Sequence, residues 1–78
     1  MKNNAIIKAT LGDLLDILDA RTIVYIYLKR SDNTQEILRP SAKVYEILNS
    51  VIYDKYRNYD VIGINKNIHS TSILIEEA

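Results

Sequence analysis

The apolar pattern is clearest directly after Thr10, where leucines recur on one helical face and aspartates fall on the other. The leucines are Leu11, Leu14, Leu15 and Leu18, and the aspartates are Asp13, Asp16 and Asp19. This period predicts a short amphipathic helix over residues 11–20 with a solvated acidic side. Thr10 supplies an N-cap, and Asp13 three residues later resembles the acidic half of a capping box.

The next stretch, residues 22–29, is almost wholly β-branched, aliphatic or aromatic, which is typical of a strand. Both alternating faces are apolar: one carries Val24, Ile26 and Leu28, and the other carries Ile23, Tyr25 and Tyr27. A strand with one solvated face would alternate apolar with polar residues. We therefore expect the second face to be covered by a helix, by the N-terminal tail or by a partner chain.

The remaining elements follow from turn residues and two further apolar patterns. A turn is predicted at residues 31–34, strands at 35–38, 61–65 and 71–76, and a helix at 42–57 with the apolar stripe Val44, Ile47, Leu48, Val51 and Ile52. Pro40 is expected to end the strand before this helix, and Ser41 to cap the helix. Gly63 inside a strand indicates a bulge or a close backbone contact.

The element order is helix, hairpin, helix, hairpin, an α+β arrangement of the type αββαββ. We expect a largely antiparallel four-stranded sheet with two helices packed on it. Residues 1–78 are predicted to form a single domain. Within it, residues 1–9 are an N-terminal tail or a short edge strand, the latter at residues 5–8.

Composition narrows the classes of function. A chain of 78 residues is too short for a two-domain enzyme, a doubly wound nucleotide-binding fold or a barrel. With no cysteine it has no disulfide framework and no thiolate metal cluster. Ten basic residues balance ten acidic ones, which argues against a general nucleic-acid binder. The longest apolar run, Ile23–Leu28, is far shorter than the about 20 residues of a membrane span, so we expect a cytoplasmic protein.

Catalytic motifs are sparse. His69 is the sole histidine and lies beside three hydroxyl residues at 70–72, which are the ingredients of an activated nucleophile. No third orienting group is evident in the sequence, and Gly12 and Gly63 are too far apart to form a phosphate-binding loop. We therefore predict a protein that is not an enzyme and has no cofactor and no metal site.

All six aromatic residues are tyrosines, which are typical of binding surfaces because they pair apolar area with a polar end. We expect protein contacts at Tyr45, Asn49, Tyr53 and Tyr56 of the second helix, and at Asp13, Asp16 and Asp19 as the electrostatic complement of a basic partner. Tyr25 and Tyr27 either pack under a helix, form a dimer face or offer a stacking surface. The small core favours oligomerisation, and we predict a homodimer.

The chain resembles, in layout, small uncharacterised proteins of low-GC Gram-positive bacteria and their phages. The resemblance lies in residues 10–19, the strand at 22–26, and the closing segments 59–64 and 72–77. It implies an accessory protein of a phage or mobile element that modulates a host protein, as inhibitors of the anti-CRISPR type do. It carries over no catalytic residue.

Together these observations predict a non-enzymatic protein-binding module, a phage-encoded modulator or inhibitor of a host defence protein. The partner would be a bacterial protein, for example a nucleic-acid-binding defence effector. The alternative is a nucleic-acid or nucleotide-binding module that stacks bases on Tyr25 and Tyr27. That alternative ranks lower because few basic residues accompany the two tyrosines.

Overall fold

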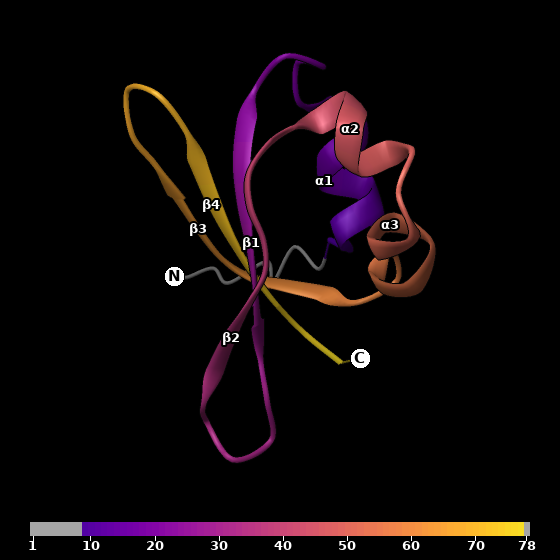
Figure 1. The fold of residues 1–78 in the computed structure, drawn as a ribbon. Helices are drawn as coiled ribbons and strands as arrows, with labels where there is room; N and C mark the ends of the chain where they lie inside the picture. The colour runs from indigo at the N-terminus through magenta and orange to yellow at the C-terminus, as the bar shows by residue number, and fades with distance from the viewer. Residues whose placement is uncertain (1–8, 78) are drawn as a thin grey trace, which may run out of the picture.

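A computed structural model describes residues 9–77, which form a four-stranded sheet with three short helices (Figure 1). The helices are α1 (Leu11–Ile17), α2 (Val44–Leu48) and α3 (Val51–Tyr56), and the strands are β1 (Ile23–Lys29), β2 (Gln35–Lys43), β3 (Asp60–Lys66) and β4 (Thr71–Glu76). The α+β class expected from the sequence is confirmed. The edge strand expected at residues 5–8 lies outside the described residues. None of the described helices is long and apolar enough to cross a membrane.

The sheet is mixed, with strand order β2-β1-β4-β3. β1 pairs antiparallel with β2, and β3 pairs antiparallel with β4, so each outer pair is a hairpin. The two hairpins meet through β1 and β4, which run parallel at the centre of the sheet. Beside β3, the backbone of Thr10 forms an isolated antiparallel bridge with Asp60, and the Val61 N–H donates to the Ala9 carbonyl at 2.9 Å.

α1 begins at the capping box expected from the sequence. The Asp13 N–H donates to the Thr10 hydroxyl oxygen at 3.2 Å, and the Thr10 N–H donates to the Asp13 carboxylate at 3.3 Å. The helix ends at Ile17, three residues earlier than expected, because Leu18 adopts extended backbone angles. After it, the Asp19 carboxylate accepts the Arg21 N–H at 2.8 Å and orders the turn into β1.

The single helix expected over 42–57 is wrong, because the chain breaks between α2 and α3. Ser50 has φ −121° and ψ 162°, an extended conformation that no helix can continue through. The side chains at the break satisfy the last carbonyls of α2: the Asn49 amide donates to the Tyr45 carbonyl at 2.8 Å, and the Ser50 hydroxyl donates to the Ile47 carbonyl at 2.6 Å.

β2 continues through Pro40 to Lys43, so the expected strand end at Pro40 and the expected cap at Ser41 are both wrong. β2 is an edge strand, where a residue without an N–H is tolerated. Its register against β1 shifts twice, and Ser41 has φ +29°, so the strand is irregular here. Lys43 takes the N-cap position of α2, and its backbone N–H donates to the Glu46 carboxylate at 2.8 Å.

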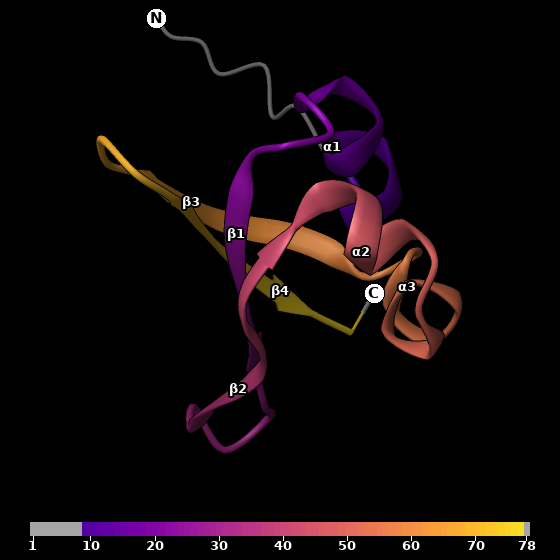
Figure 2. The same ribbon diagram turned by 45° about the horizontal axis from the view of Figure 1, so that its top comes forward.

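The hydrophobic core lies between the helices and one face of the sheet. It contains Val24, Ile26, Leu28, Ala42, Ile73 and Ile75 from the strands, and Leu11, Leu14, Leu15, Val44 and Ile47 from the helices. Because side chains alternate along a strand, Tyr25 and Tyr27 point to the other face. All three helices lie on the core side (Figures 1 and 2), so within residues 9–77 no helix covers these tyrosines, and of the alternatives left open for this face of β1 the covering helix is excluded.

Candidate functional site

The expected contact residues of the helices lie on or directly beside three neighbouring helices, and we call the exposed side chains of α1, α2 and α3 the helix layer. At one end, the Gly12 N–H donates to the Arg57 carbonyl at 2.9 Å, which joins the start of α1 to the end of α3. At the other end, the Tyr45 N–H donates to the Ala20 carbonyl at 3.1 Å, which joins α2 to the turn after α1. These two hydrogen bonds hold α1 beside the tyrosine-bearing helices α2 and α3.

The three expected aspartates are all exposed, but they differ in what else they do. Asp13 belongs to the capping box of α1, and Asp19 accepts the hydrogen bond that orders the following turn. Asp16 lies between them on the helix surface. A change at Asp16 therefore tests the acidic surface with the least disturbance of the fold.

Tyr45 is the most exposed of the three expected tyrosines of the helix layer. Its side chain is 46% exposed, and the Lys43 ammonium lies 6.0 Å from its ring centre. Asn49, also expected as a contact, uses its side-chain NH₂ to bond the Tyr45 carbonyl. The Tyr45 ring thus remains partly exposed, whereas the Asn49 amide is engaged at the end of α2.

Tyr53 and Tyr56 are half-buried on α3 and pack against the core. Tyr56 meets the ring of Tyr59 edge to face, with ring centres 4.9 Å apart and planes at 82°. The Arg57 guanidinium lies 5.4 Å from the centre of the Tyr53 ring, and the Lys55 ammonium 5.3 Å from that of Tyr56. Much of these two rings is therefore packed within the molecule, and both side chains are less exposed than that of Tyr45.

Two residues of the helix layer were missed by the sequence analysis. Ile17 and Val51 are each 79% exposed, although both are large and apolar. The sequence placed Val51 in the buried stripe of one long helix, and the break at Ser50 turns α3 so that Val51 faces outward. Ile17 could have been found, because it falls outside the leucine stripe of α1.

The second surface, which we call the open face, is the side of the sheet away from the helices. By register it comprises Tyr25, Tyr27, Lys29, Gln35, Ile37, Asp60, Leu74 and Glu76, together with Gly63. Ile37 is 46% exposed. A Cβ at Gly63 would lie 3.5 Å from the Leu74 Cβ. Gly63 lines a hollow of about 360 Å³ together with Tyr27, Gln35 and Leu74. The register shift at Gly63 confirms the bulge expected there.

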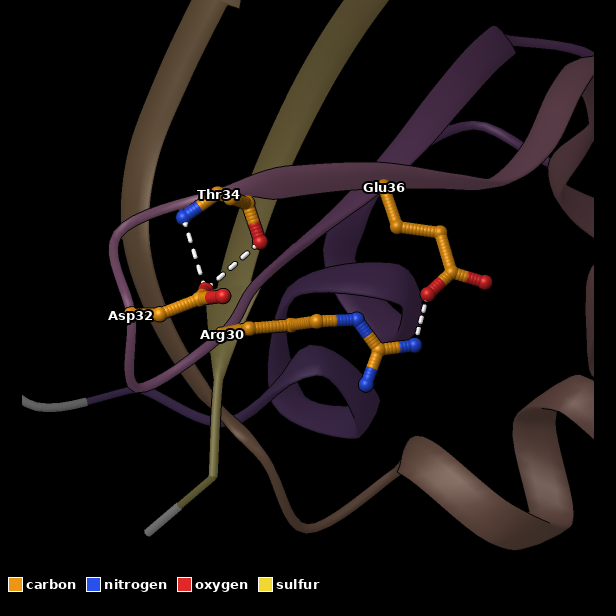
Figure 3. Close-up of polar contacts among 4 residues, drawn as sticks. All are labelled: Arg30, Asp32, Thr34 and Glu36. Carbon is orange, nitrogen blue, oxygen red and sulfur yellow. Dashed lines mark hydrogen bonds and ion pairs between the residues drawn. The ribbon is translucent and has the colours of Figure 1, made fainter.

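The polar residues of the β1–β2 turn and of the β3–β4 loop form hydrogen bonds that stabilise these two loops. In the β1–β2 turn, the Thr34 hydroxyl and the Thr34 N–H both donate to the Asp32 carboxylate, at 2.6 and 3.1 Å, and Arg30 pairs with Glu36 (Figure 3). The hydrogen bond from the Thr34 hydroxyl, and then that from its N–H, hold the pKa of Asp32 below its ordinary value. This arrangement stabilises the turn.

The loop around His69 is organised by Asn67. The Asn67 side-chain oxygen accepts the N–H groups of His69 and Ser70 and the Ser70 hydroxyl, at 3.0–3.2 Å. The neighbouring hydroxyl is therefore directed to an amide and not to the imidazole, contrary to what a nucleophile would need. Over the part of the chain that is described, no group of three His, Asp or Glu side chains could hold a metal ion.

Comparison with protein-family models, with curated proteins and with solved structures finds no match to this chain.

Proposed function

We propose that this chain is a non-enzymatic protein-binding module whose helix layer contacts a basic surface of its partner. The observation that supports this most directly is the exposure of Ile17 and Val51, each 79%, on the same layer as the acidic side of α1. Large apolar side chains gain free energy when a partner removes them from water. Within residues 9–77, most of the surface of these two side chains is uncovered.

The charges of α1 define the chemistry of the partner. Asp13 and Asp16 on α1 and Asp19 in the turn after it are exposed, and the nearest basic residue along the described chain is the exposed Arg21. Beside α2 and α3, the nearby cations lie over tyrosine rings. A partner that meets α1 with Lys or Arg would complement these carboxylates, whereas an acidic partner surface would be unfavourable. Surfaces that bind nucleic acid carry such basic residues.

A further part of the proposal is that the partner is a bacterial nucleic-acid-binding protein that the chain inhibits by covering its basic surface. The acidic α1 supports this, as does the resemblance in layout to phage accessory proteins. In this reading the chain acts by steric and electrostatic competition with nucleic acid.

The test is capture of partners from a lysate of a low-GC Gram-positive bacterium. Three tagged baits are compared: the parent chain, the Asp16→Lys variant and the Glu77→Lys variant. Glu77→Lys is the control, because it makes the same charge change outside the helix layer. We expect one host protein in stoichiometric amount with the parent chain and with Glu77→Lys, and at least about tenfold less with Asp16→Lys. Equal recovery with all three proteins contradicts the acidic interface.

A second candidate, binding of nucleic acid or nucleotides, is favoured by one observation: no described helix covers Tyr25 and Tyr27. Stacking on a sheet needs such open aromatic rings. The charges nearby favour it less, since Lys29 lies in register with Glu76 and the pair is neutral. An absorbance ratio at 260 and 280 nm on the captured material distinguishes the two candidates.

A further inference from the structure

One row of residues crosses the open face. It has a large apolar side chain at one edge of the sheet and a glycine, which has no side chain, at the other edge. Following the strand order, the row consists of Ile37, Tyr27, Leu74 and Gly63. Ile37 stands at the β2 edge and is 46% exposed. At the β3 edge Gly63 has no side chain and lines a hollow of about 360 Å³, which extends past Leu74 and Tyr27 to Gln35, whereas Ile37 does not line it. The row thus has a projection at one end and a depression at the other.

The neighbouring row on the same face shows a corresponding order of charge. It consists of Gln35, Lys29, Glu76 and Asp60, in the same strand order. The cation lies on β1 and the carboxylates lie on β4 and β3. In this row Gln35 on β2 is uncharged and Lys29 on β1 is positive, whereas Glu76 on β4 and Asp60 on β3 are negative.

We propose that the open face is the interface of a homodimer, in which two copies pack face to face about a two-fold axis parallel to β1 and β4. This axis reverses the strand order from one copy to the other, so β1 lies over β4 of the second copy and β2 lies over its β3. Two packed sheets keep their strand directions within about 30° of each other, which this arrangement satisfies.

The two-fold axis places each projection over a depression. Ile37 of one copy lies over Gly63 of the other and fills its hollow, and the same contact recurs on the other side of the axis. Near the axis, Tyr27 lies over Leu74 of the second copy. A large side chain over a glycine, repeated twice, is the shape complementarity that a self-associating surface requires.

The axis also matches opposite charges. Lys29 lies over Glu76 of the second copy, and Gln35 lies over its Asp60. A face with this balance suits a second copy of the chain, whereas a nucleic-acid site needs an excess of cations along the backbone path. Four strands spaced about 4.8 Å apart make a narrow face, so we expect dissociation constants in the micromolar range.

The proposal is independent of the proposed function, because the helix layer and the open face lie on opposite sides of the sheet (Figure 1). Sedimentation equilibrium of the purified chain from about 1 to 200 µM, bracketing the expected dissociation constant, should show a monomer–dimer equilibrium. Gly63→Val fills the hollow and should weaken the dimer by about tenfold or more. The Ile37→Ala/Gly63→Val double variant exchanges projection and depression and should recover most of the affinity.

Charge exchange gives a second, separate readout. Lys29→Glu should weaken the dimer, and Lys29→Glu/Glu76→Lys should restore it, because the double variant re-creates opposite charges across the axis. Tyr45→Ser on the helix layer is the control and should leave the dimer unchanged. A monomer at every concentration overturns the proposal, and so does a dimer that neither single variant weakens. A monomer that carries excess absorbance at 260 nm overturns it in favour of nucleic-acid stacking on the open face.

Discussion

The Gly12 N–H and the Arg57 carbonyl are joined by a hydrogen bond of 2.9 Å, which fixes the start of α1 against the end of α3. The approach is so close that a Cβ at position 12 would lie 3.2 Å from the Arg57 carbonyl oxygen and 3.6 Å from the Tyr53 hydroxyl. Glycine at this position lets two helices far apart in sequence meet, and it thereby helps to assemble the helix layer.

The first prediction concerns this contact. Gly12→Val should lower the free energy of unfolding by about 1–3 kcal/mol, because the added side chain must displace a backbone carbonyl. Urea denaturation measures the change. The comparison, made at a protein concentration where the chain is monomeric, is Gly63→Ala, whose Cβ would lie at an ordinary contact distance of 3.5 Å from Leu74. That variant should be neutral or slightly stabilising, and equal losses in both variants would show that the close approach is not the cause.

The second prediction concerns pH. The pKa of Asp32 is lowered from its ordinary value of 3.8, first by the Thr34 hydroxyl and then by the Thr34 N–H. A carboxyl with a lowered folded-state pKa contributes stability above pH 3.8, and this contribution is lost as the pH falls through the lowered value. Thr34→Ala removes the larger cause, so the pKa of Asp32 should rise toward its ordinary value.

NMR titration of the Asp32 side-chain carboxyl measures that change. Thr34→Ser keeps the hydroxyl and is the control, with the pKa expected to stay low. If Thr34→Ala and Thr34→Ser titrate alike, the hydroxyl does not set the pKa of this carboxyl, and the backbone N–H alone is sufficient.

The local elements could be predicted wherever the sequence itself carries the determining contact. The capping box at Thr10 and Asp13 involves residues three apart, and β4 has the bounds 71–76 that its alternation indicated. Leu11 and Leu15, expected on the buried side of α1, are 0% and 1% exposed. In each case the residues that determine the structure lie within a few positions of one another in the sequence.

The rest depends on contacts between distant residues. Nothing local indicates that β1 and β4 run parallel, because this pairing joins strands more than forty residues apart. The break at Ser50 was missed because Asn49 and Ser50 are compatible with a helix by propensity, and the tertiary structure decides against it. The exposure of Val51, and with it part of the candidate site, follows from that break.

The third prediction concerns the break itself. Asn49→Ala removes the side-chain hydrogen bond to the Tyr45 carbonyl and should cost about 0.5–1.5 kcal/mol of stability. Asn49→Asp is the informative comparison, because its side-chain carboxylate cannot donate to a carbonyl. It should be at least as destabilising as the alanine variant in urea denaturation. If both variants are as stable as the parent chain, the amide does not hold the end of α2.

The fourth prediction separates binding from folding at the helix layer. Ile17 and Val51 are each 79% exposed, so replacing them with serine removes little buried apolar surface. We expect Ile17→Ser and Val51→Ser each to change the free energy of unfolding by less than about 0.5 kcal/mol. Leu15→Ser, at a side chain only 1% exposed, should instead destabilise the fold by several-fold more than either.

The same two variants should lose the captured partner, because a partner would cover the side chains that the fold leaves in water. Recovery of the partner should fall by about tenfold or more in each single variant, at a protein concentration where both are folded by circular dichroism. Full recovery with both variants would remove the apolar part of the helix layer from the interface. Loss of recovery without loss of stability is the combination that a binding surface requires, since a purely structural role at these positions would change the two quantities together.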